Sequence, residues 1–165
     1  MKIFSLQSTV SFTNVFILSA MLIAAGCGTT LQPIEPIATQ YVEFKCDPKI
    51  NGGKNLPIDI IYITYVQELR EVSRLGPKQW FENQKRDEWK FKESVVLKGG
   101  DHAVVKLDPL ILERTVLLVI FADYKSVLDP AYQQVVVDFA GKESETIVVQ
   151  KSRLQPENTS LRYVK

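Results

Sequence analysis

Cys27 is the residue whose neighbours in the sequence most clearly predict a chemical reaction of its side chain. It follows an uncharged, largely apolar run over residues 15–25 and the small residue Gly26. The run is shorter than the roughly 20 apolar residues that cross a bilayer, and residues 1–26 carry a single lysine and no acidic residue. This pattern is typical of a bacterial lipoprotein signal peptide. It predicts cleavage before Cys27 and acylation of its thiol, although Ala24 stands where such signals usually have leucine.

Acylation would divide the chain into a signal peptide (residues 1–26), a lipidated terminus with a flexible tether (27–39) and a domain (40–165). Two or more acyl chains hold a protein on a bilayer stably, whereas one chain holds it only marginally. Gly28, in place of the aspartate that favours inner-membrane retention, points to the periplasmic face of the outer membrane. The alternative is an ordinary signal peptide or a short anchor with an incidental cysteine, which would leave a Cys27–Cys46 disulfide possible.

Few other side chains suit catalysis or metal binding. The only histidine, His102, follows a Gly-Gly-Asp turn and is expected to be exposed to solvent, and Cys46 is expected to be a buried small apolar residue. Asp123, Asp129 and Asp138 could gather at one end of the domain, but the sequence lacks the loop pattern of a calcium site. We therefore expect no enzyme, no metal and no cofactor.

The balance of charge argues against a nucleic-acid-binding protein. The chain has 20 basic and 19 acidic residues and a formal net charge of +1. Basic and acidic side chains are interspersed, as in Lys85-Arg86-Asp87-Glu88. Nucleic-acid-binding proteins instead concentrate positive charge on one surface. We expect no nucleic-acid partner.

The domain reads as a succession of short strands. Strands are predicted at residues 40–46, 58–66, 93–97, 103–107, 114–122, 133–139, 145–150 and 161–164. The almost continuously apolar segment 114–122 predicts a central strand covered on both faces. Gly99-Gly100, between two β-branched segments, predicts a hairpin. Such a series of strands indicates a mainly β, two-sheet sandwich.

One helix interrupts the strands, over residues 78–85, with Pro77 in its first turn. Trp80 and Phe81 on this helix, and Trp89 after it, are expected to pack on a sheet. A sugar-stacking surface is the alternative use of the aromatic residues. The candidates for it are Trp80, Trp89, Tyr62, Tyr65, Tyr124 and Tyr132.

The order of these features resembles the TssJ family of type VI secretion lipoproteins. The resemblance is carried by Cys27, the loop ending in Asn55-Leu56-Pro57, the strand over 57–63, the Trp80-Phe81 helix and the strand over 117–124. It implies a transthyretin-like sandwich with a short helical addition. It also implies a non-enzymatic lipoprotein that anchors a secretion complex by binding the periplasmic C-terminal region of the inner-membrane protein TssM, and through it TssL.

In that family the loop between the first two strands takes part in the contact, and its counterpart here spans residues 47–57. Ile50 and Leu56 are expected to be exposed apolar anchors on this loop, which Gly52 and Gly53 make deformable. The residues expected to bind the partner are Ile50, Asn51, Gly52, Gly53, Lys54, Asn55 and Leu56. A tolerated surface loop without a partner, a glycan-binding lipoprotein and a pilotin-like chaperone of a secretin remain the alternatives.

Overall fold

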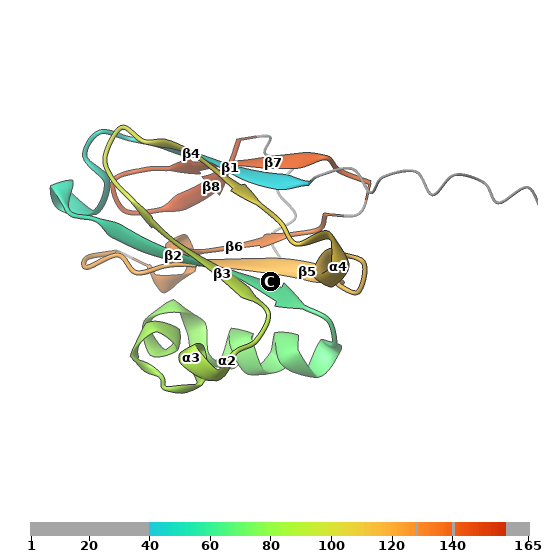
Figure 1. Ribbon diagram of the computed structural model, residues 1–165. Helices are drawn as coiled ribbons and strands as arrows, with labels where there is room; N and C mark the ends of the chain where they lie inside the picture. Colours follow the sequence, from blue (N-terminus) through green and yellow to red (C-terminus); the bar gives the residue numbers. More distant parts are fainter. Residues whose placement is uncertain (1–39, 128, 140, 158–165) are drawn as a thin grey trace, which may run out of the picture. The chain divides into compact units, whose positions relative to one another are not determined.

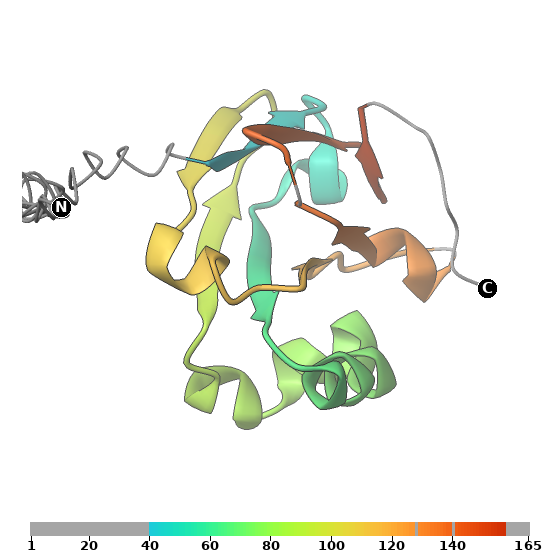
Figure 2. The ribbon, with the colours of Figure 1, turned by 90° about the vertical axis from the view of Figure 1, so that its right-hand side faces the viewer.

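The structure, a computed structural model, describes residues 40–127, 129–139 and 141–157. Two four-stranded sheets face each other, and helices cover the outer face of one of them (Figures 1 and 2). The first sheet has the strand order β4-β1-β7-β8. Its strands are β1 (Tyr41–Cys46), β4 (His102–Lys106), β7 (Ser144–Val149) and β8 (Leu154–Pro156). The predicted mainly β sandwich with a helical addition is confirmed.

The second sheet lies between the first sheet and the helices. Its order is β3-β2-β5-β6, and all neighbouring strands are antiparallel. Its strands are β2 (Leu56–Ile63), β3 (Lys92–Leu97), β5 (Leu117–Ala122) and β6 (Gln134–Val137). The apolar segment predicted to be a central strand thus forms β5, which pairs with β2 on one side and with β6 on the other.

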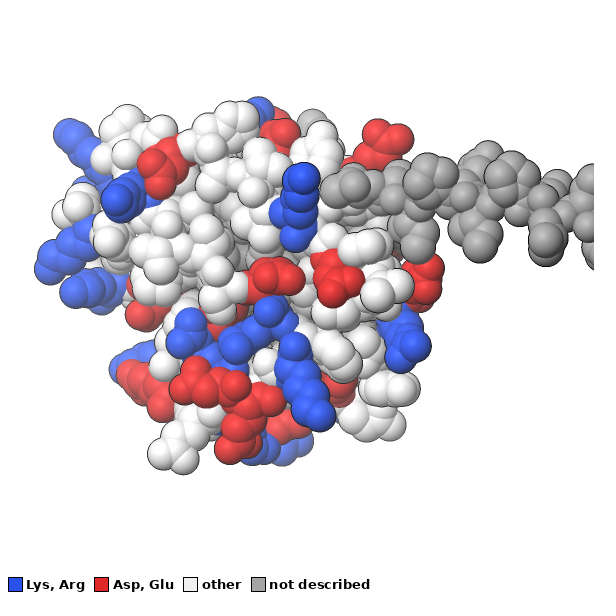
Figure 3. Space-filling model, viewed as in Figure 1, with Lys and Arg blue, Asp and Glu red and all other residues white. Residues whose placement is uncertain are grey.

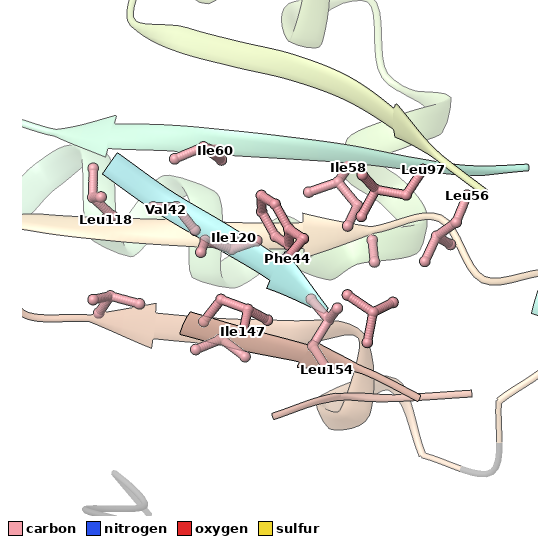
Figure 4. Packing of buried hydrophobic residues seen from close by; sticks show 14 of the residues in the cluster. Val42, Phe44, Leu56, Ile58, Ile60, Leu97, Leu118, Ile120, Ile147 and Leu154 are labelled. Carbon is pink, nitrogen blue, oxygen red and sulfur yellow. The ribbon is translucent and has the colours of Figure 1, made fainter. Parts of the chain in front are cut away.

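The main core fills the space between the two sheets. Side chains alternate along a strand, so every second residue of β2 and β5 points into this space. Phe44 of β1 packs there against Ile58 and Ile120, and all three are fully buried (Figure 4). Residues on the opposite face of the second sheet, such as Ile61 and Phe121, form a separate cluster with the helices. β2 and β5 are therefore buried on both faces.

The main helix, α2 (Val66–Glu82), is longer than the sequence predicts. The strand expected over residues 58–66 stops at Ile63, because the Glu68 carboxylate accepts hydrogen bonds from the backbone N–H groups of Thr64 and Tyr65 at 2.7 and 3.0 Å and begins a helix there. Gly76 (φ 65°) divides the helix, so that Pro77 starts a second segment carrying Trp80. A short helix, α3 (Lys85–Glu88), follows.

The predicted hairpin around Gly99 and Gly100 is wrong. β3 pairs with β2 and β4 pairs with β1, so the two strands lie in different sheets. Gly99 lies against the backbone of Pro48, where a Cβ atom would stand 2.2 Å from the carbonyl oxygen. Gly99 thus lets the chain pass beside the β1–β2 loop, where a side chain would not fit, and Gly100 supplies the left-handed turn (φ 82°) as the chain crosses between the sheets.

Short helical turns complete the fold: η1 (Ile50–Gly53), α4 (Pro109–Leu112) and η2 (Pro130–Gln133). The strand predicted at residues 161–164 lies outside the described residues, as do the signal peptide and the tether. Within the described part of the chain, no helix is both long enough and apolar enough to span a membrane.

Candidate functional site

The loop predicted to bind a partner lies at one end of the sandwich, together with three other connections. We call this the loop end and define it as residues 47–55, 98–101, 123–127 and 150–153. Backbone hydrogen bonds tie its parts together: the N–H of Gly100 donates to the carbonyl oxygen of Asp47 at 3.3 Å, and that of Asn51 to Lys151 at 3.0 Å. The β1–β2 loop therefore belongs to a composite surface.

Asn51 holds this surface together. Its backbone is in the left-handed region (φ 48°) and the residue is only 7% exposed. The side-chain amide nitrogen donates to the carbonyl oxygen of Asn55 at 2.8 Å, and the amide oxygen accepts from the backbone N–H of Lys125 at 2.9 Å. One side chain thus closes its own loop and joins it to the loop after β5.

Tyr124 secures the turn between β7 and β8. Its hydroxyl is 3.0 Å from the carbonyl oxygens of both Gln150 and Arg153. Burial raises the pKa of this hydroxyl above its ordinary value, so it remains a donor at physiological pH. With Asn51, it makes the loop end a defined surface.

The expectation that Ile50 and Leu56 are exposed anchors is wrong, because both are fully buried. Both side chains belong to the main core between the sheets, together with residues of β1 and β2 such as Phe44 and Ile58. Asn51 is also buried. The exposed candidates are Gly52, Gly53, Lys54 and Asn55. Partner binding by these residues stays a prediction.

The glycines of this loop serve turn geometry. Gly52 and Gly53 have φ values of 64° and 79°, a region that residues with a Cβ atom rarely adopt. No heavy atom lies within 4 Å of a Cβ built on either residue. The backbone of this tip is therefore open to a partner.

The loop end is basic. Lys49, Lys54, Lys98, Lys125 and Lys151 are all exposed, and none of their ammonium groups forms an ion pair with another described residue. The carboxylates of Asp47 and Asp101 instead accept from the backbone N–H groups of Lys49 and Lys98, at 2.7 and 2.8 Å. Basic side chains predominate at the left-hand end of the molecule in Figure 3, where these loops lie.

Cys46 lies beside an open depression of about 530 Å³ at this end, which is also lined by residues of the β7–β8 turn such as Lys151 and Arg153. Burial, together with the nearby negative charge of Asp101, raises the pKa of its thiol to about 11. The thiolate that a nucleophilic cysteine needs is therefore scarce at neutral pH. Cys46 is half-buried and packs against the main core, so it is less buried than the sequence predicts.

The other candidates for chemistry are scattered. His102 is exposed, with its Nε2 atom 3.6 Å from the Glu43 carboxylate. Asp129 caps η2 by accepting from the N–H of Ala131 at 2.8 Å. Within residues 40–127, 129–139 and 141–157, no group of three or more His, Cys, Asp or Glu side chains is placed to hold a metal ion.

Three of the six aromatic residues considered for sugar stacking are buried, whereas Tyr65 and Tyr132 are exposed and Trp89 is half-buried. Trp80 is fully buried, and its ring makes edge contacts with Trp89 and Phe121 at centroid distances of 5.5 and 6.0 Å. Tyr62 and Tyr124 are buried as well. Trp80 is core, as its place in the helix predicts.

Sequence reasoning missed Asp59, a fully buried carboxylate in β2. It accepts from the Trp80 indole N–H at 2.8 Å, from Arg86 Nε at 2.7 Å and from the Ser94 hydroxyl at 2.7 Å. A single acidic residue inside the apolar run Pro57-Ile58-Asp59-Ile60 was the available signal. It fixes the helices to the sheet, on the face away from the main core.

The start of β1 lies at the opposite end of the sandwich from the loop end (Figure 1). β1 is six residues long, which corresponds to about 20 Å of extended chain. The carbonyl oxygen of Gln40, at the start of the described residues, accepts a hydrogen bond from the N–H of Leu107, two residues before α4, and Cys46 leads directly into the β1–β2 loop. Cys27 itself lies outside the described residues.

The sequence matches no protein-family model and no curated protein. The fold is similar to that of a chain in a structure described as a type VI membrane complex, with a TM-score of 0.57 and 15% identity over 73% of this chain and 98% of that one. It is also similar to the type VI secretion lipoprotein TssJ1 from Pseudomonas aeruginosa, with a TM-score of 0.51 and 14% identity over 73% and 97% of the two chains.

A third similar structure is described as the C-terminal domain of the type VI secretion protein TssM from EAEC. Its TM-score is 0.54, with 14% identity over 72% of this chain and 96% of that one. At identities this low, the similarity of these structures establishes a shared fold and no more. The likeness to TssJ that the order of elements suggests is thus confirmed at the level of the fold.

Proposed function

We propose that this protein is a TssJ-like lipoprotein that anchors a type VI secretion complex in the outer membrane, without catalysis. The observation that carries this proposal is the placement of the two ends of β1. β1 begins at one end of the sandwich, a short stretch of sequence after the predicted acylation site Cys27, and the predicted partner loop follows β1 at the opposite end. The similarity of the fold to TssJ1 supports the same reading.

In this account Cys27 carries the acyl chains that hold the protein on the periplasmic face of the outer membrane. Residues 27–39 form the tether, and residues 1–26 are removed as the signal peptide. Several acyl chains make dissociation from the bilayer slow. The domain then presents its loop end away from the membrane to which it is attached.

The loop end binds the periplasmic C-terminal region of a TssM-like inner-membrane protein, and through it the complex reaches TssL. Gly52, Gly53, Lys54 and Asn55 form the exposed tip of the site, while Asn51 holds that tip in place. A contact surface that is already ordered loses little conformational entropy on binding. Rigidity of the loop end therefore favours a stable complex.

Charge indicates what the partner surface looks like. The five lysines of the loop end form no ion pair with other described residues, so they are available to carboxylates of a partner. Complementary charge steers association and fixes the orientation of a complex. We expect the contacting surface of the TssM-like protein to be acidic.

Replacement of the acylated cysteine tests the anchoring function. Cys27→Ser should move the protein from the membrane fraction to the soluble periplasmic fraction and abolish type VI secretion. Cys46→Ser is the matched control, because its half-buried thiol lies inside the domain, and it should stay in the membrane and support secretion. Normal secretion by Cys27→Ser would refute the anchoring function.

A further inference from the structure

The end of the sandwich opposite the loop end carries a surface that the proposed partner contact does not use. We call it the anchor end and define it as Gln40, residues 64–66, Phe91, α4 with the following residues 113–114, and Val116. Backbone hydrogen bonds hold these segments together. The N–H of Leu107, just before α4, donates to Gln40 at 2.9 Å, and that of Val116 donates to Ile63 at 2.7 Å.

Exposed apolar side chains gather at this end. Nine large apolar residues are exposed in the described part of the chain, and five of them lie here. They are Tyr65 (68% exposed), Val66 (57%), Phe91 (39%), Leu110 (69%) and Val116 (56%). The other four, Val96, Val104, Tyr132 and Val136, are spread over separate strands and a turn. A local concentration of exposed apolar side chains marks a surface that is covered in use.

The surface is also hollowed. Tyr65, Phe91 and Leu110 line one depression of about 470 Å³, together with Thr64, Ile111 and Arg114. The exposed guanidinium of Arg114 forms no ion pair with another described residue. Exposed aliphatic side chains with a tyrosine and a free arginine are the composition of protein surfaces at the level of lipid headgroups, where arginine binds phosphate.

The number of residues between Cys27 and the domain limits how far this surface can lie from the proposed lipid anchor. From Cys27 to Gln40 there are 13 residues (40 − 27), which span about 45 Å when fully extended and about 20 Å on average when flexible. α4 begins two residues after Leu107, whose N–H binds Gln40. α4, which carries Leu110, and the start of β1 therefore lie at the same end of the domain (Figures 1 and 2).

We propose that the anchor end rests on the surface of the outer-membrane bilayer, with Tyr65, Phe91 and Leu110 inserted among the headgroups and Arg114 bound to lipid phosphate. This inference rests on the proposed acylation of Cys27. Acylation confines the domain near the bilayer, so weak insertion suffices to hold it there. The contact orients the domain, and the basic loop end then faces the periplasm.

Depth measurement by spin labelling tests the orientation. The acylated protein, with Cys46→Ala, is placed in vesicles of phosphatidylethanolamine and phosphatidylglycerol and carries one nitroxide, at Glu113→Cys or at Lys54→Cys. Oxygen concentrates in lipid and a nickel chelate in water. We expect the ratio of oxygen to nickel accessibility to be at least threefold higher at position 113 than at position 54.

A matched comparison replaces exposed apolar residues either at the anchor end or on strands away from it. Tyr65→Ser with Leu110→Ser should lower the ratio at position 113 to that at position 54. Val96→Ser with Val104→Ser, which removes exposed apolar side chains elsewhere, should leave the ratio unchanged. Circular dichroism checks that each variant is folded.

Three outcomes would overturn the proposal. Equal ratios at positions 113 and 54 in vesicle-bound protein would refute the bilayer contact and leave anchorage intact. Shielding of position 113 in soluble Cys27→Ser protein would mean that a second copy or residues 28–39 cover the surface. A full-length protein that does not float with vesicles would refute anchorage itself, and the orientation with it.

Discussion

The carboxylate of Asp59 accepts hydrogen bonds from Nε and Nη2 of Arg86 at 2.7 and 3.1 Å. Asp59 is fully buried in β2, whereas the Arg86 side chain of α3 is 27% exposed. The pair joins α3 to β2, on the face of the second sheet that points away from the main core. Trp80 and Ser94 donate to the same carboxylate, so four hydrogen bonds compensate its removal from water.

Arg86→Met tests this junction. The substitution keeps most of the side-chain length but leaves a buried carboxylate without its counter-ion, and we expect a loss of about 3–5 kcal/mol in the free energy of unfolding. Urea unfolding of the folded domain measures it. Lys85→Met is the control, because the exposed Lys85–Glu71 ion pair, 2.6 Å long, should contribute little. An Arg86→Met protein as stable as the wild type would contradict the role of the pair.

The pH dependence of stability follows from the same group. Burial raises the pKa of Asp59, but the hydrogen bonds from Arg86, Ser94 and Trp80 lower it more, so the pKa lies below its ordinary value. The folded state therefore binds fewer protons than the unfolded state near pH 4. The stability that Asp59 contributes is present above about pH 4 and is lost as the pH falls through its folded-state pKa.

In Arg86→Met the pKa of Asp59 should rise relative to that in the wild type, because the hydrogen bonds and the positive charge of Arg86 are lost while those from Ser94 and Trp80 remain. The stability difference between the wild type and Arg86→Met should then shrink as the pH is lowered from 7 towards 3. Urea midpoints at several pH values measure this difference. A constant difference across the range would show that Asp59 is not the group responsible.

Asn51 should matter for the order of the loop end. Asn51→Ala leaves the N–H of Lys125 and the carbonyl oxygen of Asn55 without their partner, which should cost about 1–3 kcal/mol of stability. Hydrogen exchange at the Lys125 amide should become faster. Asn55→Ala is the control, because the Asn55 side chain is exposed and forms no hydrogen bond with another described residue. Unchanged exchange in Asn51→Ala would contradict the role of Asn51.

The central strand could be predicted from the sequence, whereas the first half of α2 could not. The continuous run Leu117–Ala122 predicts a central strand because apolar side chains on both faces require cover on both faces, and α2 and the first sheet supply it. The first half of α2 was missed. Leu69, Val72 and Leu75 have helical spacing and Glu68 caps the helix, but the β-branched pattern of the preceding strand continues through Val66.

Burial at the loop end could not be predicted from local pattern. Turn-forming residues around Ile50 and Leu56 suggest exposure, yet both residues fill the end of a core built by strands distant in sequence. The glycine pair at 99–100 has the same composition in a hairpin and in a crossing between sheets. The pairing of β3 with β2 and of β4 with β1, together with the contact between Gly99 and Pro48, distinguishes the two.

The basic character of the loop end should govern the rate of complex formation. Lys49→Glu with Lys54→Glu should slow association with a TssM-like periplasmic domain about tenfold at low salt and reduce its salt dependence. Lys78→Glu with Lys90→Glu makes the same charge change on the exposed helical region and should leave the rate nearly unchanged. Stopped-flow or surface-plasmon measurements distinguish the pairs. Equal slowing by both would indicate a general effect of net charge.

Binding to the partner tests the central claim most directly. The mature chain with Cys27→Ser would be titrated calorimetrically against the periplasmic C-terminal region of the TssM-like protein from the same organism. We predict saturable one-to-one binding that weakens at least tenfold in Lys54→Glu with Asn55→Glu, at the loop tip, and persists in Glu113→Lys with Arg114→Glu, at the anchor end. Absence of binding between the two folded proteins, or equal loss in both variants, would contradict the account.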